Sequence, residues 1–228
     1  MHHKVRHSKE DALSQREFQM LLEGTQKMDY HEGLQARFII LVGGRLGLRK
    51  GEIAHMKAKW VNWRRSMIEI PVQEDCKMSK DRTGICGYCR QLAKQRVKHN
   101  PDMTLEDAEE LAWIAKTEEA ARDVPFGFSP QVSLVVERFF DEYEKFPYSA
   151  SAISRRVKKA ARLAEEIDPD DIYVHCLRAT AATYHAARGL DVIPLQSLMG
   201  WAQVSTAHNY VQASGENTAR ALHFIHSQ

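Results

Sequence analysis

Residues 175–210, HCLRATAATYHAARGLDVIPLQSLMGWAQVSTAHNY, predict two successive helices followed by a third. Gly189 and Gly200 each come directly after an apolar helical pattern. Glycine commonly ends a helix because it adopts the left-handed conformation without strain. Ser205 is expected to cap the last helix, which would bear Tyr210. This stretch therefore predicts a helical unit with several polar side chains.

The flanking sequence predicts further helices around a small β-region. Ser14 and Glu17 form a capping-box pattern ahead of an apolar helical face. Residues 60–72 alternate between apolar and polar, which is typical of a strand hairpin, and a second hairpin is expected at 111–126. The expected fold class is mainly α with a small antiparallel β-sheet. Helices are expected from Leu13, over about 32–46, at 51–53, from Pro130 to near Pro147, and over about 151–166.

Composition indicates a globular protein and excludes few functions. The chain has 228 residues, of which 43% are hydrophobic, enough to bury a core. Lys and Arg total 32 against 30 for Asp and Glu, so nucleic-acid binding has to be argued from local basic clusters, at 63–65, 90–98 and 155–159. The sequence contains no apolar run of about 18 residues and no secretory h-region. We therefore expect a soluble, cytoplasmic protein that has no membrane partner.

A polar segment at about 74–110 interrupts the regular patterns and is expected to be an inserted loop. It contains Cys76, Cys86 and Cys89, and His99 is a candidate fourth ligand for a structural zinc of the Cys3His type. The alternative interpretation is a reduced loop without metal. Cys176 is expected to be a small buried side chain.

Three side chains have the chemistry needed to cut a phosphodiester. Its negative oxygens repel a nucleophile, so an enzyme that does not use a metal must supply fixed cations, a nucleophile and a proton donor. Arg49 and Arg178 are suited to clamping the phosphate oxygens, and Tyr210 could attack the phosphorus. Taken alone, each residue is more often structural, and Arg49 could simply pair with Glu52.

The remaining functions can be assigned to three further side chains. Lys116 could protonate the departing 5′ oxygen, and His175 could move the proton of the nucleophile. Trp201 could donate its indole hydrogen to a nonbridging oxygen, although a single tryptophan is usually a core aromatic. The occurrence of all six candidate side chains together, in this order along the chain, is what favours a catalytic function.

Four ordered segments resemble the tyrosine recombinases, or phage-type integrases. GLRKGEI around Arg49 is similar to the family's first arginine motif, and HCLRAT matches its HxxR box. In LMGWAQVSTAHNYV, Trp201 stands where the family has His or Trp, and Tyr210 follows nine residues later (210 − 201). AKTEEAARDVPF resembles the hairpin that carries the family's lysine.

This resemblance implies one catalytic domain over residues 1–228, without the family's N-terminal core-binding domain. It implies a site-specific recombinase that cuts double-stranded DNA at an attachment site through a 3′-phosphotyrosine. It further implies a homotetramer on DNA and no cofactor for the chemistry. The CGYC insertion is similar to that of haloarchaeal integrases, which favours an archaeal virus or plasmid. The near-neutral charge lacks the acidic excess of a halophilic protein.

Two other functions are compatible with these residues. One is nicking and resealing of DNA in the manner of a type IB topoisomerase, without strand exchange. The other is a non-catalytic DNA-binding module. The complete set of candidate catalytic residues favours an enzyme.

Overall fold

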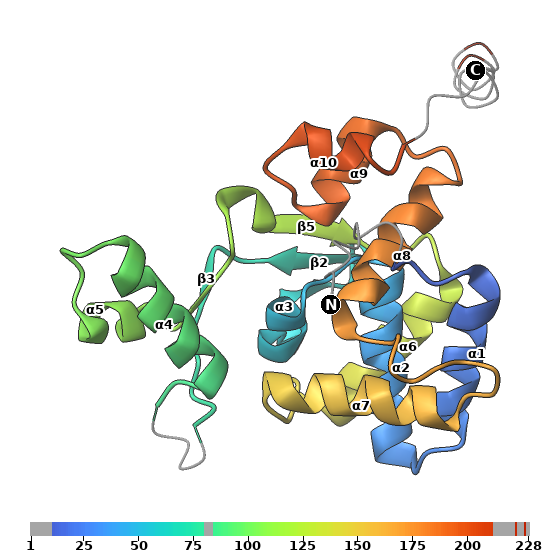
Figure 1. Ribbon diagram of the computed structural model, residues 1–228, viewed down its shortest axis with the longest axis horizontal. Helices are drawn as coiled ribbons and strands as arrows, with labels where there is room; N and C mark the ends of the chain where they lie inside the picture. The colour runs from blue at the N-terminus through green and yellow to red at the C-terminus, as the bar shows by residue number, and fades with distance from the viewer. Residues whose placement is uncertain (1–10, 80–83, 212–221, 223–225, 227–228) are drawn as a thin grey trace, which may run out of the picture.

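The computed structural model describes residues 11–79 and 84–211, together with Leu222 and His226. Helices make up most of this region, and two small antiparallel sheets lie beside them (Figure 1). The expected α+β class is confirmed. The amphipathic tail expected at 216–225 lies almost entirely outside the described residues. None of the described helices is long and apolar enough to cross a membrane.

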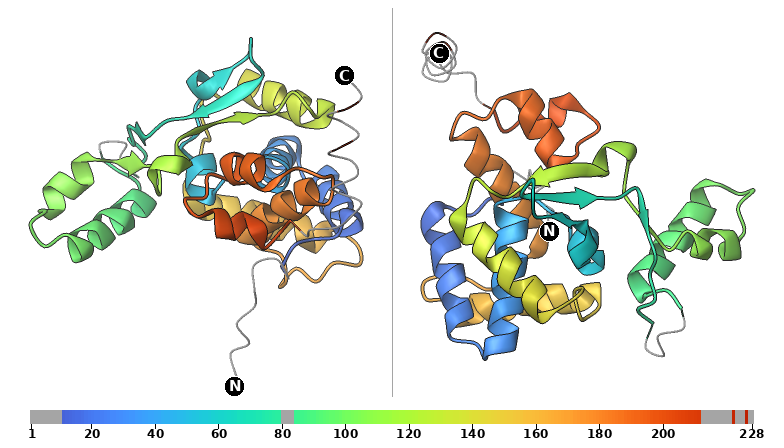
Figure 2. Two further views of the ribbon diagram at one scale, coloured as in Figure 1. Left: turned by 90° about the horizontal axis from the view of Figure 1, so that it is seen from above. Right: turned by 180° about the vertical axis from the view of Figure 1, so that it is seen from behind.

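Helix α2 (Tyr30–Gly44) forms the centre of the core. Its sequence is apolar on nearly every side and its residues from Leu34 on are almost all buried, so neighbours must surround it. Other helices therefore pack around α2 (Figures 1 and 2). These are α1 (Gln15–Gln26), α6 (Pro130–Glu142), α7 (Ala150–Leu163) and α8 (Val174–Ala186).

Local capping signals define the helix ends as predicted. The Ser14 hydroxyl accepts from the amide of Glu17, and the Glu17 carboxylate accepts from the amide of Ser14. Helix α6 starts with Pro130 after its cap, Ser129. Helix α9 (Val192–Met199) ends at Gly200, whose φ of 57° is left-handed. These local predictions are confirmed.

The position of Tyr210 differs from the expectation. Gln203, not Ser205, occupies the N-cap position of helix α10 (Val204–His208), without a side-chain hydrogen bond to the helix, and Tyr210 follows the helix. Its amide donates to the carbonyl of Ala207, which continues the last turn irregularly. The prediction that Tyr210 lies on the helix itself was therefore wrong, because the short helix ends two residues before it (210 − 208).

The strands are divided between two sheets in a way the sequence did not predict. Strands β1 (Val61–Asn62), β2 (Met67–Ile70) and β5 (Arg122–Pro125) form one sheet, while β3 (Gln73–Glu74) pairs with β4 (Trp113–Ile114). The hairpin expected at 60–72 is confirmed. The hairpin expected at 111–126 is wrong, because β5 pairs with β2 and buries Val124 opposite Ile68. Alternation predicts a strand but not its partner.

The segment expected to be a loop contains two helices, α4 (Gly87–His99) and α5 (Leu105–Glu110). They pack against each other and project from the body next to β3 (Figure 1). The sequence hides them because α4 buries only Cys89 and Ala93, and α5 only Ala108. Such a narrow apolar surface lacks the stripe by which helices are recognised.

Candidate active site

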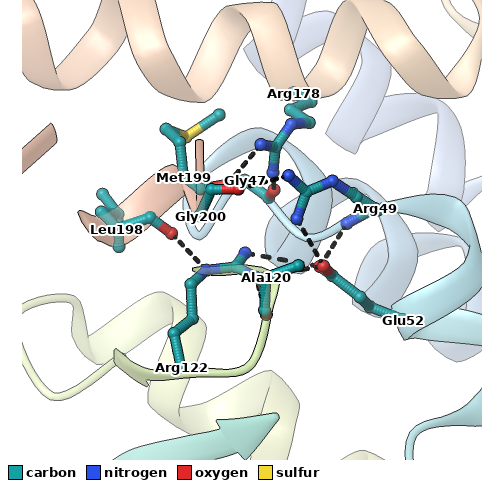
Figure 3. A network of polar contacts seen from close by, with 9 residues as sticks. All are labelled: Gly47, Arg49, Glu52, Ala120, Arg122, Arg178, Leu198, Met199 and Gly200. Atoms are coloured by element: carbon teal, nitrogen blue, oxygen red, sulfur yellow. Dashed lines mark hydrogen bonds and ion pairs between the residues drawn. The ribbon is translucent and has the colours of Figure 1, made fainter. Parts of the chain in front are cut away.

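Arg49 and Arg178 converge from distant parts of the chain (Figure 3). Arg49 is the N-cap of α3 (Lys50–His55), and one of its nitrogens donates to the carbonyl of Gly200 at 2.5 Å. Arg178 lies on α8, is 5% exposed, and donates to the carbonyls of Gly47 and Met199. Two guanidinium groups are therefore held side by side beneath the end of α9.

Glu52 is the buried carboxylate that organises these cations. It accepts from Arg49 at 2.8 Å and from Arg122 at 3.0 Å, with its own side chain only 2% exposed. Burial opposes ionisation, but the charges of Arg122, Arg49 and Arg178 outweigh it and lower the pKa of the Glu52 carboxyl. Burial also lowers the pKa of Arg178, and the charge of Arg49 adds to this effect. The site remains an ionised cluster at neutral pH.

Arg122, on β5, is a site residue that the sequence patterns do not single out. Only 5% of its side chain is exposed, against 18% for Arg49, the other ion-pair partner of Glu52. Besides Glu52, it donates to the carbonyls of Leu198 at 2.8 Å and Ala120 at 2.8 Å. Its only sequence signal is its place in the lysine-hairpin segment, three residues before Pro125 (125 − 122).

The C-terminus of α9 is bound by all three arginines. The last carbonyls of a helix lack partners within the helix and carry partial negative charge. Each of the three carbonyls at this end accepts a hydrogen bond from a different guanidinium, which attaches the helix to the arginine cluster. The pairs are Arg122 with Leu198, Arg178 with Met199, and Arg49 with Gly200.

Trp201 and Tyr210 follow this helix end and lie against Arg178. Their rings stack, with centroids 5.3 Å apart and planes 18° from parallel. The Arg178 guanidinium lies 5.6 Å from the centroid of the Trp201 ring, and Tyr210 is 7% exposed. The structure therefore brings the phenol next to the arginine pair.

His175 and Lys116 lie at the edge of the same cluster. His175 is exposed, one turn before Arg178 on α8. Desolvation and the charges of Arg178, Lys116 and Arg49 lower its pKa against the opposing charge of Asp11, which favours the neutral imidazole, the form that accepts a proton. Lys116, which is exposed, and Arg49, which is partly buried, line one cavity of about 480 Å³.

A second constellation consists of His55, Cys76, Cys86 and Cys89. All four are buried, and their ligand atoms lie within 4.8 Å of one another. His55 Nε2 is 3.2 Å from the sulfur of Cys89 and 3.5 Å from that of Cys86. Three thiols and one imidazole at this separation are a set that fits zinc.

The sequence suggested His99 as the histidine of this cluster, but the structure places His55 there instead. His99 is ten residues after Cys89 on α4 (99 − 89), which corresponds to about 15 Å along the helix. It is exposed, and its Nδ1 contacts the carbonyl of Gln95 at 2.7 Å. Helix geometry therefore places His99 out of reach of the three cysteines.

Close packing of the thiols alters their acidity. Hydrogen bonds from Cys76 and Cys89 lower the pKa of Cys86, while the neighbouring Cys76 and Cys86 raise the pKa of Cys89. Burial disfavours the charged form of His55, but hydrogen bonds to Cys76 and Cys86 prevail and raise its pKa to about 9. Cys176 lies apart in the core, where burial raises its pKa to about 11, as expected of an inert thiol.

Comparison with known proteins agrees with this geometry. The profile of the Phage integrase family matches residues 11–217. The chain belongs to the phage integrase family. A family relative, tyrosine recombinase XerD of Xanthomonas axonopodis pv. citri (strain 306), is 27% identical over 215 residues, which cover 94% of this chain and 62% of XerD. The chain thus spans less than two thirds of that relative.

Solved recombinase structures share the fold of this phage integrase family member. The Tn1549 transposon integrase in complex with transposon right end DNA gives a TM-score of 0.60 at 17% identity, covering 100% of this chain and 69% of that one. XerA recombinase gives 0.57 at 17% identity, covering 95% of this chain and 64% of that one. XerH bound to difH substrate gives 0.54 at 14% identity, covering 99% and 57% respectively.

Proposed function

We propose that this chain is a catalytic domain, residues 1–228, of a site-specific recombinase that cuts and rejoins DNA through a 3′-phosphotyrosine. The observation that carries this proposal is the convergence of Arg49 and Arg178 beside Tyr210. Paired guanidinium groups bind the nonbridging oxygens of a phosphate, and a phenol can attack its phosphorus. Membership of the phage integrase family supports the same reaction.

The cleavage step assigns one function to each side chain. Tyr210 Oη attacks phosphorus, a phosphotyrosyl bond forms, and the bond to the 5′ oxygen breaks. His175 takes the phenol proton, which its lowered pKa permits at pH 7. Lys116 protonates the departing 5′ oxygen, and Trp201 donates to a nonbridging oxygen. Rejoining is the reverse reaction with another 5′ hydroxyl.

The partner is double-stranded DNA at a specific attachment site. Exchange between two duplexes requires four strand cuts, and each protomer offers one tyrosine nucleophile, so we infer a homotetramer on DNA. The XerH and Tn1549 proteins were solved with DNA, which supports this partner. The work would be done in the cytoplasm, where the DNA is. The CGYC insertion supports a mobile element of an archaeal virus or plasmid.

A nicked suicide substrate tests the reaction. DNA flanking the element that encodes this chain is incubated with the protein, and the covalent adduct is mapped by mass spectrometry. The wild type should form a 3′ adduct on Tyr210, and Tyr210→Phe should form none. Tyr30→Phe is the matched control, because Tyr30 is 60% exposed and bonds to Glu142 on α6 instead. An adduct of equal yield with Tyr210→Phe would refute the assignment.

The same DNA distinguishes recombination from nicking and resealing. Two paired sites on one plasmid should yield recombinant product with the wild type. Relaxation of supercoils without any recombinant product would instead support a type IB topoisomerase-like activity, and binding without cleavage would support a DNA-binding module.

We also infer that the set of His55, Cys76, Cys86 and Cys89 holds one structural zinc ion. These four buried side chains would fill all the coordination positions of a zinc ion, which is typical of a structural and not a catalytic zinc site. The helices of the insertion bury little apolar surface of their own, so they need such a link.

A further inference from the structure

We propose that the metal bound by this Cys3His cluster sets the positions of Arg49 and Lys116, which makes the insertion a positioning element of the active site. This inference rests on the proposed function and on the proposed zinc. Three contacts carry it: one through α3, one through β4, and one through α4.

The first contact runs along α3. His55 ends this helix and Arg49 caps its start, with Glu52 between them. His55 Nδ1 lies 2.8 Å from the carbonyl of Gly51 and donates to it, which leaves Nε2 pointing at the sulfurs of Cys86 and Cys89. Metal-bound histidines usually donate their other ring nitrogen in this way. A metal at Nε2 therefore holds the single short helix that positions Arg49.

The second contact runs along β4. The Trp113 ring stacks on the His55 ring, with centroids 5.7 Å apart and planes 20° from parallel. Trp113 is buried, and Lys116 follows it by three residues (116 − 113). The carbonyl of Val72 accepts from the amide of Ala115 at 2.8 Å, so the strand remains ordered almost to Lys116. The orientation of the His55 ring thus determines the position of β4 and of Lys116, which follows it.

The third contact is made by α4. Tyr88 precedes the ligand Cys89 and packs against Gly51, where an added Cβ would lie 2.6 Å from the tyrosine oxygen. Tyr88 and Trp113 line the cavity of about 480 Å³ into which Arg49 and Lys116 also face. The insertion therefore forms one wall of the space beside both catalytic cations.

These contacts explain why the metal would affect catalysis and not only folding of the insertion. Without it, His55 is linked to α4 and β4 through weak hydrogen bonds to sulfur and two ring contacts. With it, four strong bonds would join α3, the segment after β3 and α4 at one point, and β4 would be held through the Trp113 ring on His55. The central helix α2 buries its own apolar surface and does not depend on this link.

Hydrogen exchange on the full chain without DNA tests the coupling. Metal content is measured first, and exchange is then compared between metal-loaded protein and protein treated with chelator under reducing conditions. Amides of 50–55 and 113–116 should exchange at least tenfold faster without metal, while those of α2 stay unchanged. Unchanged exchange at 50–55, or a purified wild type that neither contains nor takes up zinc, would overturn the proposal whether or not the protein cleaves DNA.

Cleavage of a suicide substrate supplies the second readout. Metal removal, or Cys86→Ser, should lower the single-turnover rate about 100-fold, with DNA affinity changed less than threefold. A substrate with sulfur at the 5′ bridging position has a leaving group that needs no proton. If metal removal displaces Lys116, the fall in cleavage rate should therefore be at least tenfold smaller with this substrate than with the ordinary one. Cys176→Ala, outside the cluster, should retain both metal and rate. Equal cleavage rates with and without metal would refute the coupling but leave the recombinase assignment intact. Absence of cleavage by both forms would count against the recombinase assignment. In that case the hydrogen-exchange data would still decide the coupling.

Discussion

At the scale of single residues, Glu52 and Arg122 show how a cluster of arginines, the proposed phosphate site, is stabilised within the protein itself. Three arginines in close proximity repel one another, and the buried carboxylate of Glu52 compensates two of them directly. Arg122 does not belong to the chemistry assigned above. Its guanidinium is a positioning group that connects Glu52 to the end of α9.

Replacing Arg122 should destabilise the protein strongly. Arg122→Met leaves Glu52 with one fewer charge partner and the carbonyl of Leu198 without its donor, so the free energy of unfolding should fall by about 3 kcal/mol. Urea denaturation measures this change. Arg65→Met is the control, because Arg65 is 51% exposed and its removal should change stability by less than about 1 kcal/mol. Equal midpoints for the two variants would contradict this account.

At the scale of elements, strand β3 attaches the insertion to the body through Glu74. This carboxylate is 4% exposed and accepts from Lys57 at 2.8 Å, Lys59 at 3.0 Å and the indole of Trp60 at 2.7 Å. Burial opposes its ionisation, but the three hydrogen bonds prevail and lower the pKa of Glu74 to about 2. The start of the insertion is therefore anchored by an ionised buried group.

This anchor should make stability depend on pH in a defined direction. Because the folded pKa of Glu74 is below the unfolded value, its contribution is complete above about pH 4.5 and is lost as pH falls toward 2. Glu74→Gln should therefore be less stable than the wild type at pH 7, and the difference should shrink at pH 3. Urea unfolding at both pH values measures it. A difference that is independent of pH would show that Glu74 is not ionised in the fold.

At the scale of the whole molecule, the proposed nucleophile, Tyr210, belongs to a separate small hydrophobic cluster. Tyr210 packs with Leu195, Met199 and Ala207 against alanines of α8, apart from the main core around α2. The arginines bind the end of α9 mainly through its carbonyls. A segment held by few apolar contacts opens more readily than a central helix.

Native-state hydrogen exchange should show this difference in stability. Amides of α9 and α10 are expected to exchange at least 100-fold faster than those of α2, because opening them exposes the small cluster and Leu198 but leaves the rest of the main core packed. Mass spectrometry of peptides from both regions measures the ratio. Equal protection would mean that the tyrosine segment and the core unfold as one unit.

The sequence by itself determined the features that depend on neighbours along the chain. The ends of α1, α6 and α9 follow from caps and glycine conformation, and the ordered motifs around Arg49, Arg178 and Tyr210 indicated the chemistry. Contacts between distant segments could not be read in this way. Charge and ligand pairing depend on distance in space, which a residue's position along the chain does not reveal.

Tertiary structure alone decided the pairing of β5 with β2, the ion pair of Arg122 with Glu52, and the choice of His55 for the cysteine cluster. His55 precedes Cys86 by 31 residues, whereas His99 follows it by 13 (86 − 55; 99 − 86). His99 lies at the far end of α4, so the rise of the helix separates it from the cysteines. His55 lies close to them because α3 packs against the insertion.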